Sequence, residues 1–211
     1  MNREWASTGD YVAPSLERSP EVYYILQALD AYGCQGFLDI HGDEEIEGTC
    51  WVLFVLCYVV VLLSCCLCLC PLLNCPHPPT LISSHTHTLP ANFLNKGTNG
   101  AATVNASLEA LHRAFTQTLL DVNPDFQTDK DYGTKAPGTQ NFSICSAQIT
   151  QRFQCFAATL EQPFKDTADE YPQETTGWNP VRCERLGWTL LDAFHSVAVG
   201  LKSDGGGEGK L

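Results

Sequence analysis

The stretch Gly36-Phe37-Leu38-Asp39-Ile40-His41-Gly42-Asp43-Glu44 joins a short apolar run to a dense polar cluster. Such a run is typical of a buried strand, and ligands in open α/β sheets bind just beyond the carboxyl ends of strands. An imidazole there, followed by a glycine that permits a sharp turn, suits a metal ligand or a general base. A histidine at a strand end is more often structural, and the His41-x-x-Glu44 spacing also arises by chance.

A helix is predicted immediately before this strand. Ser19 can cap the helix, Pro20 suits its first position, and Gly33 can close its last turn. Its apolar residues fall on one face: Val22, Ile25, Leu26 and Leu29. A helix followed by a strand is the repeating unit of an α/β sheet, so we predict the α/β class.

A second stretch, Cys155 to Glu161, repeats this design, because a compact apolar run ends in a carboxylate and Pro163 follows to stop the strand. A glutamate at a strand end is usually only solvated. Placed beside a metal-bound water, Glu161 would be a general base.

The remaining pattern predicts three more helices and one long surface loop. The first helix is capped by Ser107 and runs to about Val122, and the last begins at Pro180 after Asn179 and ends at Gly200. Residues 141–153 are ambiguous and favour a helix. Residues 125–138 are polar and rich in turn residues, and therefore predict a surface loop.

Charge and cysteine usage restrict the class of protein. A net charge of -12 and a pI near 4.7 argue against a nucleic-acid partner, whose phosphates would be repelled. Seven of the eleven cysteines fall between Cys50 and Cys75, and the others are Cys34, Cys145, Cys155 and Cys183. These four lie in helix and strand patterns, as reduced, buried thiols do. With no secretory signal pattern at the N-terminus, we expect a reducing, cytoplasmic compartment.

The segment from Gly48 to Gly97 differs from the rest, since Lys96 is its only formally charged side chain. Residues 50–73 are almost wholly apolar, and roughly 20 such residues would span a bilayer. By hydropathy a membrane helix is favoured, but a crossing would separate His41 from everything that follows, and the flanks lack the usual Lys and Arg asymmetry. We therefore prefer an insert foreign to the fold. His85-x-His87 and the nearby cysteines follow no zinc-finger spacing.

Four motifs in order resemble the C-terminal part of a zinc carboxypeptidase domain of peptidase family M14, in its cytosolic carboxypeptidase-like branch. They are Asn2-Arg3-Glu4-Trp5, Ser19-Pro20-Glu21-Val22, Leu38 to Glu44, and Thr159 to Asp166. The resemblance covers 1–47 and 89–199. It implies a mixed sheet flanked by helices and interrupted by the apolar insert, with carboxypeptidase-like segments at 1–47 and 89–201 on either side of 48–88. Independently of the resemblance, the glycine-rich residues 202–211 predict a disordered tail.

The resemblance also implies a role for each matching residue. Asn2 and Arg3 match the pair that grips the free carboxylate of a peptide, a role suited to the arginine fork, although Arg3 alone reads equally as a solvated charge. His41 matches the third ligand of one Zn²⁺. Glu161 matches the catalytic carboxylate that takes a proton from the zinc-bound water. The substrate implied is the C-terminus of a peptide or protein, and which C-terminal residue is removed stays open.

Departures from the family pattern qualify this expectation. The family's first two zinc ligands come from a His-x-x-Glu motif upstream of Asn-Arg, and an upstream arginine stabilises the oxyanion; neither is in this chain. Since catalytic zinc takes three protein ligands, we expect poor zinc binding and little or no turnover from the chain as written. The alternatives are a membrane-anchored, non-catalytic interaction protein, with 50–73 as its transmembrane helix, and a related zinc deacylase.

Overall fold

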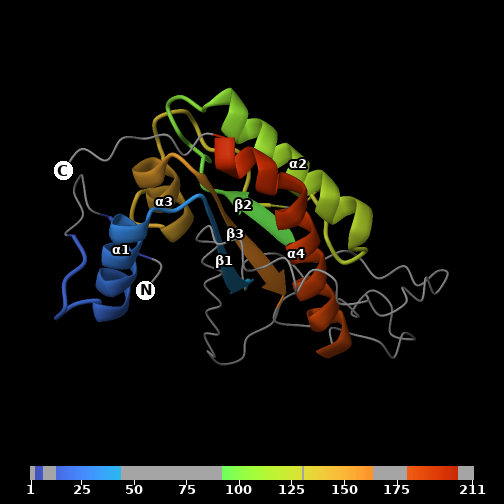
Figure 1. Ribbon diagram of the computed structural model, residues 1–211, viewed down its shortest axis with the longest axis horizontal. Helices are drawn as coiled ribbons and strands as arrows, with labels where there is room; N and C mark the ends of the chain where they lie inside the picture. Colours follow the sequence, from blue (N-terminus) through green and yellow to red (C-terminus); the bar gives the residue numbers. More distant parts are fainter. Residues whose placement is uncertain (1–2, 7–12, 44–91, 130, 164–179, 204–211) are drawn as a thin grey trace.

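The computed structural model describes residues 3–6, 13–43, 92–129, 131–163 and 180–203. Within them, three strands form one mixed sheet in the order β1-β3-β2 (Figure 1). β1 (Gly36–Asp43) runs parallel to β3 (Phe156–Pro163), and β2 (Phe93–Lys96) runs antiparallel to β3 on its other side. The described part of the chain is therefore α/β with helices on both faces of the sheet, as predicted.

The central strand β3 is buried on both faces, which explains why it begins with apolar residues on both. Phe156, Ala158 and Leu160 face one hydrophobic cluster, and Ala157 faces another. Both clusters therefore form around the same strand.

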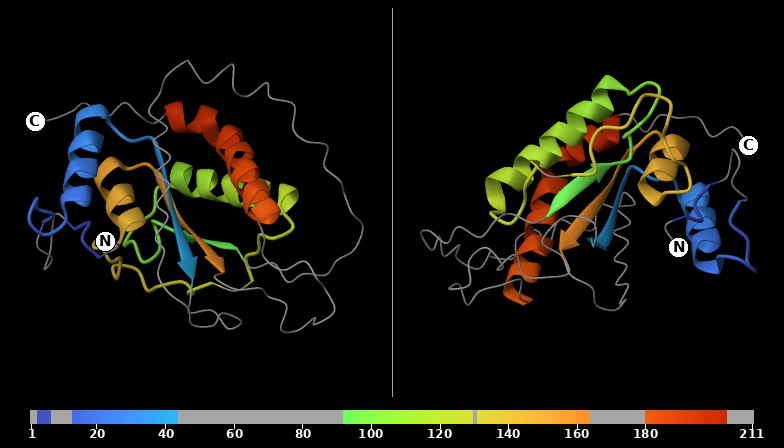
Figure 2. Two further views of the ribbon diagram at one scale, coloured as in Figure 1. Left: turned by 90° about the horizontal axis from the view of Figure 1, so that it is seen from below. Right: turned by 180° about the vertical axis from the view of Figure 1, so that it is seen from behind.

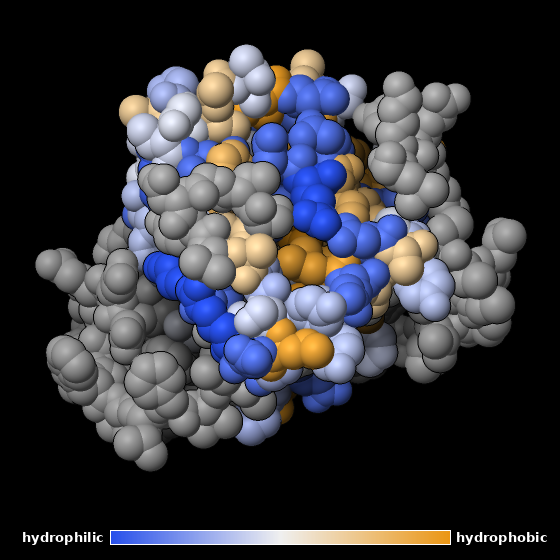
Figure 3. All heavy atoms as spheres, turned by 90° about the vertical axis from the view of Figure 1, so that its left-hand side faces the viewer, coloured by the Kyte–Doolittle hydropathy of each residue, from blue (hydrophilic) through white to orange (hydrophobic). Residues whose placement is uncertain are grey.

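α2 (Ala106–Val122) and α4 (Pro180–Ser203) cover one face of the sheet, and α1 (Pro20–Tyr32) and α3 (Cys145–Phe153) cover the other (Figure 2). Under α2 and α4, the aromatic rings of Phe115, Phe156 and Phe194 contact one another, with centroids 4.8–5.9 Å apart. Figure 3, which looks onto the α1 side, shows mainly hydrophilic side chains with scattered apolar ones. The helices thus bury one apolar face each and leave a polar one outside.

The first helix agrees closely with its prediction. α1 begins at Pro20 and ends before Gly33, whose φ of 80° is the left-handed conformation that glycine adopts freely. Val22, Leu26 and Leu29 are buried. Ser19 occupies the N-cap position, but its hydroxyl makes no capping hydrogen bond.

Three local predictions are wrong. Asn105, and not Ser107, caps α2: its side-chain oxygen accepts a hydrogen bond from the Ser107 backbone N–H at 2.8 Å. α4 does not end at Gly200 but continues to Ser203. Gly200 has a packing role instead: a Cβ there would lie 2.6 Å from Leu111 Cδ2, so the glycine permits α2 and α4 to pack closely. Cys183 is exposed, whereas Cys34, Cys145 and Cys155 are fully or partly buried, and all four are free thiols.

The loop predicted at the surface after α2 is only partly exposed. Asp125 and Phe126 are buried, and the backbone of Asn92 exchanges hydrogen bonds with Asp125 and Gln127 at 2.9 Å. This contact places the start of β2, and hence the residue beside Glu161, against the end of α2. Asn179, the apolar segment 50–73 and the tail 204–211 lie outside the described residues.

Candidate active site

His41 and Glu161 are direct neighbours across the two parallel strands. They come from strands 120 residues apart in the chain, and both lie near the carboxyl ends, where α/β sheets place their ligand sites. His41 Nδ1 is 3.7 Å from Glu161 Oε1. The structure thus brings together the imidazole and the carboxylate that the sequence nominated from separate motifs.

A third group, Asp39, joins this pair. Because side chains alternate along a strand, Asp39 lies two residues before His41 on the same face of the sheet. Its Oδ2 is 2.8 Å from His41 Nε2, an electrostatic contact rather than an aligned hydrogen bond. Asp39 is 6% exposed and Glu161 is 5% exposed. Sequence reasoning missed Asp39, although its spacing of two from His41 was the available signal.

The two carboxylates control the charge of the imidazole. Burial by itself would lower the pKa of His41, but the adjacent Asp39 and Glu161 outweigh it and raise this pKa to about 9. The ring is therefore protonated at neutral pH when no metal is bound. A metal ion at this ring would have to displace that proton.

Neighbouring elements hold the site from both sides. Phe93 of β2 pairs with Glu161 on the side opposite His41 and is buried. At the first turn of α3, Cys145 contacts Asp39, and burial followed by the Asp39 charge raises the pKa of this thiol. The Ser146 and Thr159 hydroxyls are 3.0 Å apart. Glu161 therefore sits on a strand fixed along both edges and on one face.

The predicted substrate-binding residues are only partly described. Arg3 lies in an exposed turn, two residues before Trp5, whose ring packs edge-on against Phe37 of β1 at a centroid distance of 6.1 Å. Trp5 therefore lies on the sheet face that carries Phe37 and, by the alternation of side chains along β1, also Asp39 and His41. Asn2 and Glu44 lie outside the described residues. The roles of Asn2, Arg3, His41 and Glu161 stay predictions.

The described residues do not complete a metal site. A catalytic zinc ion normally takes three protein ligands, and within 3–6, 13–43, 92–129, 131–163 and 180–203 no group of three His, Cys, Asp or Glu side chains is arranged to hold one. The His41 imidazole, with Asp39 against its second nitrogen, fits one ligand of such a site. The described donor set alone does not fit a bound zinc ion.

In the part of the chain that the structure describes, no helix is both long and apolar enough to span a bilayer. The apolar segment 50–73, which suggested a membrane helix, lies outside that part.

No family model matches the chain. An uncharacterized protein of Zymomonas mobilis subsp. mobilis is 29% identical over 191 residues, which cover 90% of this chain and 37% of that protein. The metallo-carboxypeptidase from Pseudomonas aeruginosa, solved in complex with (2-guanidinoethylmercapto)succinic acid, is 29% identical with a TM-score of 0.65 and matches 95% of this chain.

A metallo-carboxypeptidase from Burkholderia cenocepacia is 27% identical, with a TM-score of 0.62 over 94% of this chain. The chain spans about two fifths of the length of these relatives, 40% and 39% of the two solved structures. Over most of its length, the chain is structurally similar to bacterial metallo-carboxypeptidases.

Proposed function

We propose that His41 and Glu161 belong to a hydrolytic site of the metallo-carboxypeptidase type, with zinc as the metal and the C-terminus of a peptide or protein as the substrate. The observation that carries the proposal is their pairing at the ends of adjacent parallel strands. The likeness to bacterial metallo-carboxypeptidases supports it. In this proposal the cytosolic branch is the parent and the compartment is cytoplasmic.

Each residue of the site then has a definite task. Asp39 lies against Nε2 of His41 and leaves Nδ1, on the Glu161 side, as the ligand nitrogen. Zinc, when bound, supplies Lewis acidity. Glu161 accepts a proton from water and returns it to the leaving amine. Asn2 and Arg3 hold the substrate carboxylate.

The remaining zinc ligands must come from outside the described residues, because these arrange no group of three His, Cys, Asp or Glu side chains around a metal position. We therefore expect the site at His41 to hold well under one tight equivalent of zinc and the chain to have little or no activity. One tight equivalent that is lost in His41→Ala would contradict this incomplete donor set, whereas zinc held by the cysteines between Cys50 and Cys75 would remain in that variant.

Metal titration tests the role of His41. The cysteines between Cys50 and Cys75 would also bind zinc, so Co²⁺ is the better probe: thiolate ligands give intense near-ultraviolet charge-transfer bands, whereas nitrogen and oxygen ligands do not. At excess Co²⁺ we expect the bands of a weakly bound nitrogen and oxygen site in the difference spectrum between the wild type and His41→Ala, and the same bands in the difference spectrum between Glu161→Gln and His41→Ala. Identical spectra for the wild type and His41→Ala would contradict the assignment.

Peptide hydrolysis tests the role of Glu161. The chain, supplied with zinc, is incubated with a mixture of synthetic peptides, and products are identified by mass spectrometry. Any activity should release single residues from the C-terminus and disappear in Glu161→Gln. Internal cleavage, or unchanged cleavage by Glu161→Gln, would argue against a carboxypeptidase.

A further inference from the structure

Two cysteines occupy equivalent places at the other end of the same two strands. Cys34 lies in the connection from α1 to β1, directly after Gly33, and Cys155 lies in the connection from α3 to β3, directly after Gln154. Gly33 and Gln154 both have positive φ angles, 80° and 50°. Each helix therefore ends in a sharp turn that delivers a cysteine to the start of a strand.

The strand register begins beside these cysteines and sets them close together. Gly36 pairs with Phe156, so extending the register back by one residue sets Cys155 beside Gln35, one residue from Cys34. With parallel strands about 4.8 Å apart and a rise of about 3.3 Å per residue, the two Cα atoms are roughly 6 Å apart. Disulfides commonly join Cα atoms roughly 4.4–6.8 Å apart. Both thiols also line the same small hollow.

The pKa values of the two thiols shift in opposite directions. The hydrogen bond from Cys155 lowers the pKa of Cys34, with burial opposing and the Gly36 backbone assisting. The same hydrogen bond, together with burial, raises the pKa of Cys155. Since the thiolate is the nucleophile, Cys34 is the reactive member and Cys155 holds the shared proton.

The two thiols also differ in access. Cys34 is half-buried, whereas Cys155 is 7% exposed. Both line a hollow of about 40 Å³, together with Gln35, Phe153 and Gln154. On this measure about 10–15 Å³ is enough for one water molecule, so the hollow admits a reagent as small as hydrogen peroxide.

We propose that Cys34 and Cys155 form a peroxide-reactive thiol pair that closes to a disulfide joining the starts of β1 and β3. The Cys34 thiolate attacks one oxygen of hydrogen peroxide, the O–O bond breaks, and the departing hydroxide takes a proton to become water. The Cys155 sulfur then attacks the sulfenic sulfur of Cys34. The S–O bond breaks, and the second hydroxide leaves as water with the Cys155 proton. Two thiols are oxidised by two electrons, and one peroxide is reduced to two waters.

The other described cysteines provide internal controls. Cys145 is buried, and its pKa is raised by burial and by Asp39. Cys183 is exposed on α4, on the opposite face of the sheet from α1 and α3. We expect Cys145 to stay reduced and Cys183 to oxidise without forming a bond to Cys34.

Peptide mapping of the full-length chain can isolate each of these cysteines. Combined cleavage after Glu, Lys and Arg releases Cys34 in the peptide 22–44 and Cys155 in the peptide 153–161, with no other cysteine in either. Cys145 falls in 136–152, and Cys183 falls in 183–184. The chain is treated with one equivalent of hydrogen peroxide, free thiols are blocked with N-ethylmaleimide at low pH, and the digest is analysed by mass spectrometry.

The expected product is 22–44 linked to 153–161, with two hydrogens lost, and it should disappear after reduction with dithiothreitol. In Cys155→Ser, Cys34 should accumulate as a sulfenic acid that dimedone traps. In Cys34→Ser, Cys155 should stay reduced, and Cys183→Ser should leave the cross-link unchanged.

Three results would overturn the pair: a Cys34 sulfenic acid in the wild type with no linked peptide, a link from Cys34 to a cysteine between 50 and 75, or dimedone labelling of Cys155 in Cys34→Ser. The linked peptide is sought in the wild type, so the decision does not depend on the folding of any variant.

Discussion

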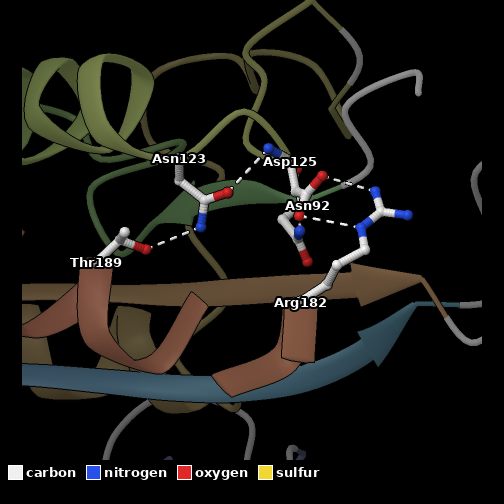
Figure 4. A network of polar contacts seen from close by, with 5 residues as sticks. All are labelled: Asn92, Asn123, Asp125, Arg182 and Thr189. Atoms are coloured by element: carbon white, nitrogen blue, oxygen red, sulfur yellow. Dashed lines mark hydrogen bonds and ion pairs between the residues drawn. The ribbon is translucent and has the colours of Figure 1, made fainter. Parts of the chain in front are cut away.

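The buried ion pair between Arg182 of α4 and Asp125, in the loop after α2, offers a quantitative test of how the start of α4 is held in place (Figure 4). Arg182 Nη2 lies 2.6 Å from Asp125 Oδ1, and Nε lies 3.1 Å from Oδ2, a two-point contact. Arg182 is 9% exposed and Asp125 is 2% exposed. Arg182→Met keeps much of the side-chain volume but leaves the Asp125 carboxylate buried without its cation.

The expected cost follows from that burial. Removing one partner of a buried pair destabilises a protein by about 3–5 kcal/mol, because an uncompensated charge stays inside. This is a large fraction of the roughly 5–15 kcal/mol that stabilises a typical domain. The double variant Arg182→Met with Asp125→Leu should cost less than Arg182→Met alone, since no charge is then left unpaired.

The chain contains a matched control. Arg152 and Asp30 form the same two-point contact, at 2.7 and 2.6 Å, but their side chains are 33% and 43% exposed. A solvent-exposed pair contributes only about 0–1 kcal/mol, so Arg152→Met should have little effect on stability.

Urea unfolding of the purified chains, followed by circular dichroism, gives the free energy of unfolding for each variant. Equal losses for Arg182→Met and Arg152→Met would refute the reasoning from burial. A double variant less stable than Arg182→Met would refute the role of the unpaired carboxylate.

Three further predictions concern single residues. The ring of His41 should titrate near pH 9 by NMR in the metal-free chain. Because this folded-state pKa exceeds the usual 6.5, protonated His41 adds up to about 3 kcal/mol to the free energy of unfolding below pH 6.5, and this contribution is lost as the pH rises through 9. Asp39→Asn should lower that pKa, and an unchanged value would contradict the charge assignment. Gly97→Ala should cost about 1–3 kcal/mol or more in urea unfolding, since its Cβ would meet the Ala157 carbonyl oxygen at 2.7 Å. The comparison Gly187→Ala, in the open, should instead stabilise α4 by about 0.5–1 kcal/mol. Phe156→Ala, which removes a ring at the centre of the aromatic cluster, should cost about 3–5 kcal/mol, and a loss under about 1 kcal/mol would contradict that placement.

Local sequence signals determined most of the elements. Helix α1 and the strands that carry His41 and Glu161 were predictable, because proline at a helix start, glycine at a helix end and apolar runs each act within a few residues. Both strands continue two residues beyond their predicted polar ends, to Asp43 and Pro163. Where two nearby residues could serve, as Asn105 and Ser107 could for the cap of α2, local pattern did not select between them. Gly200 has a tertiary reason that a local reading misses, because α2 lies against it.

The sequence by itself determined that an imidazole and a carboxylate each end an apolar run, and its family resemblance linked the two. Only the tertiary structure decided that β3 lies between β1 and β2, which makes His41 and Glu161 neighbours and adds Asp39. The same register decided that Cys34 meets Cys155, and the packing of α4 decided that Arg182 reaches Asp125. Strand order and register depend on burying both faces of β3 at once, a requirement shared by residues far apart in the chain, so no single stretch encodes it.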